Sequence, residues 1–217
     1  MAINVHQYFL SLQFSSMTNY KVIYFNGRGR AEIIRLTLTQ AKQSFSDTRV
    51  QGEEWTKLKP STPKGQLPVL EIDGKMICES MAITRHLGRE LGLYGKTNLE
   101  ATTCDMVLES IAEIINACVT RKFRAKTEEE IAAADEKINL ALQRCETFLA
   151  RIKQGKYVLG DQASIADIAI FDVCDMARWS MKSINVDEYT VMNEIANTFS
   201  SQEHIKAYVS ARPETTF

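Results

Sequence analysis

The first part of the chain alternates short apolar runs with amphipathic segments of helical period. The run Tyr20–Phe25 predicts a strand, and the turn residues Asn26-Gly27-Arg28-Gly29 follow it. A helix is predicted from about Arg30 to Lys42, and a second strand near Phe45–Val50. The apolar positions of that helix are Ile33, Ile34, Leu36 and Leu38.

The next segment, Gln51–Gln66, has no clear period and is expected to be irregular. Two short apolar runs, Leu67–Ile72 and Met76–Cys78, flank an Asp73-Gly74 dipeptide, which is a strong signal for a β-hairpin. A helix over about Ser80–Leu91 closes this part of the chain. The order β-α-β and then β-β-α predicts a small mixed sheet with helices packed on its faces.

The pattern becomes purely helical after a turn-rich stretch at Leu93–Asn98. A long helix is predicted over Leu99–Phe123, and a second begins at Thr127, where Thr-Glu-Glu-Glu has the spacing of a capping box. Ser164-Ile165-Ala166-Asp167 is another capping box and opens an unusually apolar run, as expected of a buried central helix. On the first long helix the expected apolar side consists of Met106, Ile111, Ile114, Ile115 and Cys118.

Composition narrows the range of functions. The 217 residues include 26 basic and 27 acidic ones, so charge gives no indication of a nucleic-acid or anionic-membrane partner. No apolar run reaches the roughly 18 residues that span a bilayer. The five scattered cysteines favour reduced thiols in a cytosolic protein over a disulfide framework, and three distant histidines offer little material for a metal site.

Candidate chemistry is concentrated where the first strand ends. The Tyr24 hydroxyl is expected near the strand's carboxyl end, directly before the amino terminus of the next helix, which is a common arrangement for small-molecule sites in α/β folds. Residues 1–16 lack the basic start and continuous apolar run of a signal peptide, so we interpret them as an extension preceding a domain that begins near Met17.

Five motifs, in this order, resemble those of one family: YFNGRGRAE, GQLPVLEIDG, ESMAITRHL, YVLGDQASIADIAIFD and RPET. The chain resembles the cytosolic glutathione transferases and is most similar to the sigma class, which includes glutathione-dependent prostaglandin D synthases. The resemblance implies a thioredoxin-like α/β domain over 17–95, which binds glutathione as cosubstrate, and an all-α helical bundle over 96–217, which lines the electrophile site. Such a pocket would be built from helix-facing side chains such as Met106, Cys174 and Phe217.

The chemistry of a thiol explains why a tyrosine is useful at this position. A free thiol titrates at roughly pH 8.5, and the thiolate is the reactive form. A neutral phenol can donate a hydrogen bond to the thiolate and so lower the thiol pKa. We therefore assign Tyr24 as the catalytic donor, and the resemblance implies a supporting role for Arg30. Arg28 is expected to face solvent.

Dispersed polar contacts are needed for the rest of glutathione. Leu67, extended before Pro68, could pair with the tripeptide backbone beside Gln66, and the resemblance implies a cis bond to Pro68. Ser80 is a candidate N-cap whose helix terminus would suit the γ-glutamyl carboxylate. Glu79 stands where sigma members commonly have glutamine, which leaves its orientation open.

Further positions follow from the resemblance alone. Trp55 and Lys59 match residues that hold the glycyl end of glutathione. Glu109 and Glu113 are the candidates for an acidic residue that reaches the ligand ammonium across a homodimer interface, with Asp105 as an outside alternative. Cys78, on a predicted strand, is expected in the core rather than at the site.

The sequence thus predicts a cytoplasmic, homodimeric glutathione transferase that conjugates hydrophobic electrophiles in detoxification and needs no metal. The alternatives are a glutathione-dependent prostaglandin H2 D-isomerase, a catalytically weak crystallin-like protein and a carrier of hydrophobic ligands. The sequence does not identify the physiological electrophile.

Overall fold

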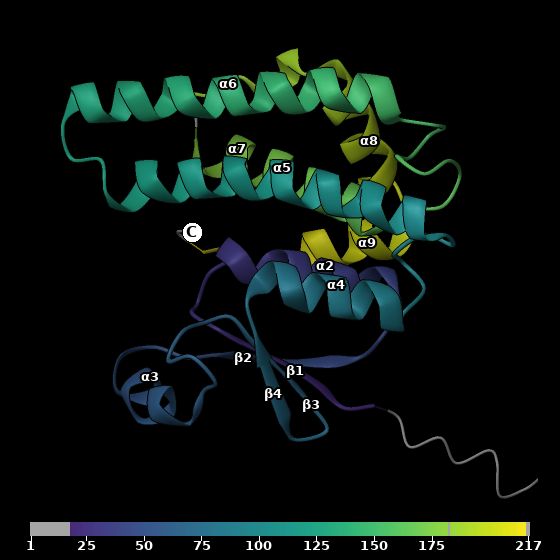
Figure 1. The fold of residues 1–217 in the computed structure, drawn as a ribbon. Helices are drawn as coiled ribbons and strands as arrows, with labels where there is room; N and C mark the ends of the chain where they lie inside the picture. The colour runs from purple at the N-terminus through teal and green to yellow at the C-terminus, as the bar shows by residue number, and fades with distance from the viewer. Residues whose placement is uncertain (1–17, 182, 216–217) are drawn as a thin grey trace, which may run out of the picture.

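A computed structural model describes residues 18–181 and 183–215 (Figure 1). A four-stranded sheet forms one end of the molecule and a bundle of long helices the other. Helices α2 (Glu32–Gln40) and α4 (Ser80–Glu90) lie between them. The α/β part and the helical part are as predicted, whereas the proposed extension at residues 1–16 lies outside the described residues.

The sheet has the strand order β2-β1-β3-β4. Its strands are β1 (Tyr20–Tyr24), β2 (Phe45–Arg49), β3 (Val69–Ile72) and β4 (Lys75–Cys78). β1 pairs parallel with β2 and antiparallel with β3, and β3 forms a hairpin with β4. The hairpin turn has positive φ at both Asp73 and Gly74, as the Asp-Gly signal predicted.

Alternate residues of β1 face opposite sides of the sheet. Val22 and Tyr24 belong to the large core that includes α2, α4 and the bundle, whereas Ile23 packs in a smaller cluster on the other side. Trp55 and Leu58 cover that smaller cluster. The alternation therefore places the Tyr24 ring on the side of the sheet that faces the helical part of the molecule.

The prediction of an irregular segment at Gln51–Gln66 was wrong. Helix α3 (Gly52–Leu58) and the 3₁₀ turn η2 (Lys59–Ser61) occupy most of it. None of the α3 residues is fully buried, and only Trp55 and Leu58 pack on the sheet, so the short helix has too weak an apolar period to be recognised.

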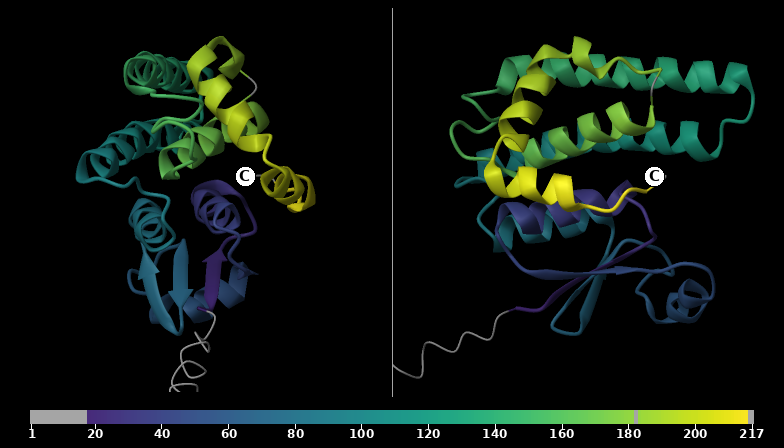
Figure 2. Two further views of the ribbon diagram at one scale, coloured as in Figure 1. Left: turned by 90° about the vertical axis from the view of Figure 1, so that its right-hand side faces the viewer. Right: turned by 180° about the vertical axis from the view of Figure 1, so that it is seen from behind.

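Two antiparallel helices dominate the other half of the molecule. A third lies behind them in Figure 1 and in front of them in the right-hand view of Figure 2. These are α5 (Asn98–Phe123), α6 (Glu128–Ile152) and α7 (Ile165–Ser180), followed by η3 (Val186–Glu188), α8 (Thr190–Ser200) and α9 (Glu203–Ala211). The pattern did not predict α8 and α9, and in neither helix does the N-cap residue make a side-chain capping bond. Met106, expected on the apolar side of α5, is instead 47% exposed and does not belong to the buried face of that helix.

The predicted capping boxes are present at both helix starts. Thr127 caps α6 together with Glu130. At α7 the buried Asp167 carboxylate accepts hydrogen bonds from the Ser164 N–H, the Ser164 hydroxyl and the Val158 N–H, each at 2.8 Å. Because it ties the preceding loop to the helix start, this carboxylate fixes the position of the most buried helix in the bundle.

Ionic side chains join the sheet side to the bundle. Arg35 on α2 is 1% exposed and donates to Asp47 on β2, to Glu32 and to the Gly27 carbonyl oxygen. Glu32 also accepts from Tyr208 and from Arg212 near the carboxyl end of the described chain. The network thus connects β2, α2 and α9.

Asp167→Ala is expected to reduce the free energy of unfolding by about 2–3 kcal/mol, because it leaves buried donors unsatisfied. Urea denaturation measures this effect, with the exposed Asp161→Ala as control. A variant that unfolds like the wild type but has lost its activity would mean that Asp167 acts at the site rather than in the fold.

Candidate active site

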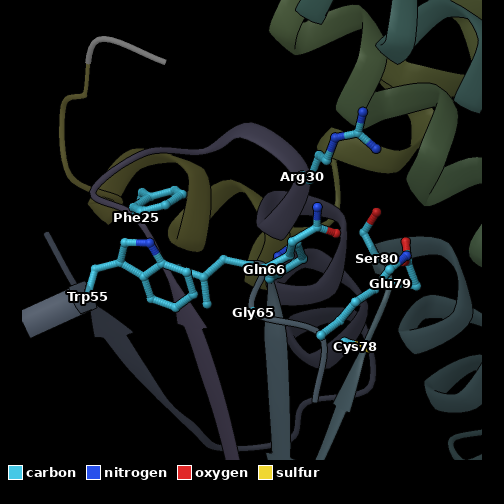
Figure 3. Close-up of a pocket in the computed structure, with 11 residues that line it drawn as sticks. Phe25, Arg30, Trp55, Gly65, Gln66, Cys78, Glu79 and Ser80 are labelled. Atoms are coloured by element: carbon cyan, nitrogen blue, oxygen red, sulfur yellow. The ribbon is translucent and has the colours of Figure 1, made fainter. Parts of the chain in front are cut away.

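A cavity of about 470 Å³ opens at the carboxyl end of β1, beside the segment that leads into β3 (Figure 3). The residues that line it come from four separate segments of the chain: Phe25, Arg30, Trp55, Lys64, Gly65, Gln66, Leu67, Pro68, Cys78, Glu79 and Ser80. Most of the site residues predicted from the sequence therefore meet at one cavity. Tyr24 and Lys59 are not among its lining residues.

Tyr24 lies next to this cavity, since it contacts the lining residues Phe25 and Arg30. Its side chain is 8% exposed, and its hydroxyl oxygen accepts a hydrogen bond of 3.2 Å from the backbone N–H of Arg30. Burial raises the pKa of the Tyr24 phenol, an effect that the Arg30 N–H and the charges of Arg30 and Arg35 oppose and that Asp172 reinforces. The phenol is therefore neutral near pH 7 and retains its proton for donation.

Gly29 permits this close approach of the turn to Tyr24. Its φ is +40°, and a Cβ atom at this position would lie 2.7 Å from the Tyr24 hydroxyl oxygen. The backbone conformation and the lack of space both require glycine here. The turn sequence thus determines how near the Arg30 amide comes to the phenol.

The Arg30 side chain extends from the upper rim of the cavity toward the helical bundle (Figure 3). Its Nη2 donates a 2.7 Å hydrogen bond to Oδ1 of Asn116 on α5. Arg30 thus contacts Tyr24 through its backbone and the bundle through its guanidinium. Arg28, expected to face solvent, instead stacks 4.4 Å over the Trp179 ring and pairs with Asp175, because α7 covers the turn.

The segment before β3 forms the floor of the cavity. The Leu67–Pro68 peptide bond is cis, as the resemblance implied. Gln66, Leu67 and Pro68 all line the cavity, with Gln66 near its centre (Figure 3).

An ion pair lies at the start of α4. Ser80 is the first helical residue rather than the N-cap, which is Glu79 with a φ of +69°. The Glu79 carboxylate pairs with the ammonium of Lys64, whose pKa it raises. Lys64 lines the cavity but was missed in the sequence, because its pairing with Glu79 depends on the tertiary fold.

Aromatic side chains form the opposite wall. Phe25 and Trp55 meet edge to face, with ring centroids 5.7 Å apart (Figure 3). Lys59 lies just behind the lining, where its Cε is 3.6 Å from the position that a Cβ on Gly65 would take. Phe25 gave no signal in the sequence beyond that of an ordinary strand residue.

The cysteines divide into two groups. Cys78, expected in the core, lines the cavity because β4 ends at its rim. The other four are buried in the bundle, where burial raises the thiol pKa, to about 11 for Cys104 and about 12 for Cys118, Cys145 and Cys174. Cys174 therefore belongs to the core and does not line an electrophile pocket as expected. Within the described residues, no group of His, Cys, Asp and Glu could hold a metal ion.

The cross-interface candidates lie on the exposed side of α5. Glu109 pairs with Arg85, and Glu113 lies 3.7 Å from Arg144. Asp105 pairs with Arg85 and accepts a hydrogen bond from Tyr94. Glu109 and Glu113 are the more exposed of the three, and both remain candidates.

A second cavity, of about 460 Å³, lies between α5 and α6. Asn116 forms part of its wall, so the Arg30–Asn116 bond joins a lining residue of one cavity to a lining residue of the other. Alanines provide much of its apolar surface: Ala117, Ala125, Ala133 and Ala134.

Gly29→Ala is expected to lower the free energy of unfolding by about 2–3 kcal/mol, because left-handed strain adds to the displacement of Tyr24 from its hydrogen bond. Gly52→Ala is the matched control, since Gly52 has a φ of +51° with open space around it and should cost only about 1 kcal/mol. Equal losses in urea denaturation would show that the contact with Tyr24 has no energetic weight.

Comparison with known proteins agrees with this geometry. Residues 20–89 match the family model "Glutathione S-transferase, N-terminal domain", and residues 109–212 match "Glutathione S-transferase, C-terminal domain". In the described part of the chain, no helix is long and apolar enough to cross a membrane.

Individual relatives cover nearly the whole chain. A hematopoietic prostaglandin D synthase of Gallus gallus is 34% identical, with 92% of this chain and 99% of the relative covered. Glutathione S-transferase 4 of Caenorhabditis elegans is 34% identical with the same coverage. A Nu-class transferase structure from Haemonchus contortus is 31% identical, with a TM-score of 0.80 and 93% of this chain and 100% of that one covered. Two matching domains in order, together with relatives aligned over almost their full length, show that this chain belongs to the glutathione S-transferase family.

Proposed function

We propose that the protein is a glutathione transferase that conjugates the glutathione thiolate to hydrophobic electrophiles. Family membership supports the reaction class. The observation that carries the proposal is the neutral Tyr24 phenol, which is held by the Arg30 N–H beside a polar cavity.

The hydrogen-bond geometry gives Tyr24 a definite role. Because its oxygen already accepts from the Arg30 amide, its own proton is directed to another acceptor. A thiolate in the cavity would accept that bond, and the bond favours the anion over the neutral thiol. The positive charge of Arg30 reinforces the same anion, so both residues lower the pKa of the bound thiol.

The remaining lining residues have the chemistry to hold a tripeptide with two carboxylates and one ammonium. Leu67 lines the cavity between Gln66 and Pro68, in the bend before β3, where its backbone could pair with the peptide. Ser80 at the amino end of α4 suits the γ-glutamyl carboxylate, and Glu79 suits the neighbouring ammonium. We assign Trp55 and Lys59 to the glycyl end.

We further propose that residues 17–95 form the glutathione domain, preceded by an extension at 1–16, and that residues 96–217 supply the electrophile site. The cavity between α5 and α6 is linked to Arg30, because Asn116 lines this cavity and accepts a hydrogen bond from the Arg30 guanidinium. This link supports a binding site for the electrophile in the helical bundle.

Sigma-class membership, a homodimer and a cytoplasmic location in detoxification complete the proposal. In the dimer, Glu109 or Glu113 would approach the ammonium of glutathione bound to the partner subunit. Both carboxylates are largely exposed in the single chain, which supports their availability to a second copy.

Tyr24→Phe is expected to leave glutathione affinity nearly unchanged and to lower turnover near neutral pH by about 2–4 kcal/mol in the barrier, since it removes a donor to the thiolate. Conjugation of glutathione to an aryl halide measures the loss, and the melting temperature checks the fold.

Tyr20→Phe is the matched control, because it removes a hydroxyl from a buried tyrosine on the same face of β1. Its turnover should remain near that of the wild type. Unchanged turnover of Tyr24→Phe at mildly acidic pH would contradict the assignment of Tyr24 as the hydrogen-bond donor to the thiolate.

Conjugation is expected to exceed prostaglandin H2 isomerisation in kcat/KM. Isomerisation requires a pocket that holds a long substrate in one pose, whereas small alanines form much of the bundle cavity. Parallel assays with an aryl halide and with prostaglandin H2, with the isomers separated, test this order. A far larger constant for prostaglandin D2 formation would favour the specific isomerase.

A further inference from the structure

Arg30 differs from the other arginines at the junction between the two halves of the molecule. Arg28 pairs with Asp175, Arg35 with Glu32 and Asp47, and Arg212 with Glu32 and Asp175. In contrast, the Arg30 guanidinium has no ion pair among residues 18–181 and 183–215. Its side-chain partner is the neutral amide of Asn116, at 2.7 Å.

The position of this bond is specific. Asn116 lies on the exposed side of α5, in the half of the molecule opposite the sheet, 86 residues along the chain from Arg30. Its Oδ1 accepts a hydrogen bond from Nη2 of Arg30, and the backbone amide of Arg30 donates to the Tyr24 hydroxyl. One residue of the bundle thus fixes the direction of the guanidinium at the rim of the cavity (Figure 3).

We propose that Asn116 is a positioning residue for the glutathione reaction: it orients the Arg30 guanidinium with a neutral acceptor, so that the positive charge remains available to the bound thiolate. This inference rests on the proposed function and adds a residue of the helical half to the group that activates the thiol.

The neutrality of the acceptor is the essential property. A carboxylate in the same place would hold the guanidinium at least as firmly, but its negative charge would oppose that of Arg30 at the thiolate. The charge of Arg30 already reaches the neighbouring phenol, where it acts to lower the Tyr24 pKa. An amide provides the hydrogen bond without this opposing charge.

The test is Asn116→Asp, which is nearly isosteric and adds one negative charge. The pKa of bound glutathione, followed by thiolate ultraviolet absorbance against pH, is expected to rise by about one unit, so that the thiolate fraction below that pKa falls about tenfold. Asn116→Ser keeps a neutral acceptor and should shift the pKa less. A role confined to folding would not move this titration in a variant that melts like the wild type.

Two controls separate the mechanism from a general charge effect. Asn139→Asp makes the same substitution at an exposed position of α6, where no contact with Arg30 exists, and should leave the thiol pKa unchanged. In an Arg30→Met background, Asn116→Asp should shift the thiol pKa much less than it does in the wild type, because residues that act through one another are not additive.

The outcomes are distinct. An unchanged thiol pKa in folded Asn116→Asp, or an equal shift with and without Arg30, overturns the role of Asn116. A wild-type protein that shows no thiolate absorbance with glutathione, at concentrations where glutathione binding is measured directly, contradicts the proposed function itself.

Discussion

The buried guanidinium of Arg35 is the constraint on which the arrangement of the site depends. It lies between the sheet and the bundle and donates to Asp47, to Glu32 and to the Gly27 carbonyl oxygen. Removing one partner of a buried charge typically costs about 3–5 kcal/mol, because the other charge remains buried without compensation. The hydrogen bond from Arg35 to the Gly27 carbonyl oxygen therefore fixes the turn after β1, and its loss would destabilise the fold.

The geometry at Tyr24 follows from this anchored turn. With Gly27 held by Arg35 and Gly29 in a left-handed conformation, the next amide, that of Arg30, points at the phenol oxygen. The hydrogen bond between Tyr24 and Arg30 is local in sequence, but its geometry also depends on the end of the chain. Tyr208 on α9 and Arg212 directly after it bind the same Glu32 carboxylate that accepts from Arg35. The helical half thus stabilises a hydrogen bond made entirely within the α/β half.

This division explains what the sequence could predict. Capping boxes, the Asp-Gly hairpin and the Tyr24–Arg30 proximity involve residues a few positions apart, so their spacing is visible in the sequence. The sequence did not identify Lys64 or Asn116 as site residues, because their partners lie 15 and 86 positions away. Helix α3 was missed for a different reason: its contact with the sheet is too short to impose a period.

Burial also affects the charged groups near the Tyr24 phenol, because it raises the pKa of the neighbouring Asp172. Asp172, on α7, is nearly fully buried, and burial together with Glu32 and Asp175 raises its pKa well above the usual range of an aspartic acid. A protonated Asp172 adds no negative charge near Tyr24, whereas an ionised one would oppose an anion bound there. Burial thus favours the neutral form of both Tyr24 and Asp172, while the neighbouring arginines remain charged. The charges of Arg30 and Arg35 act against burial and lower the Tyr24 pKa, so they also favour an anion that binds beside the phenol.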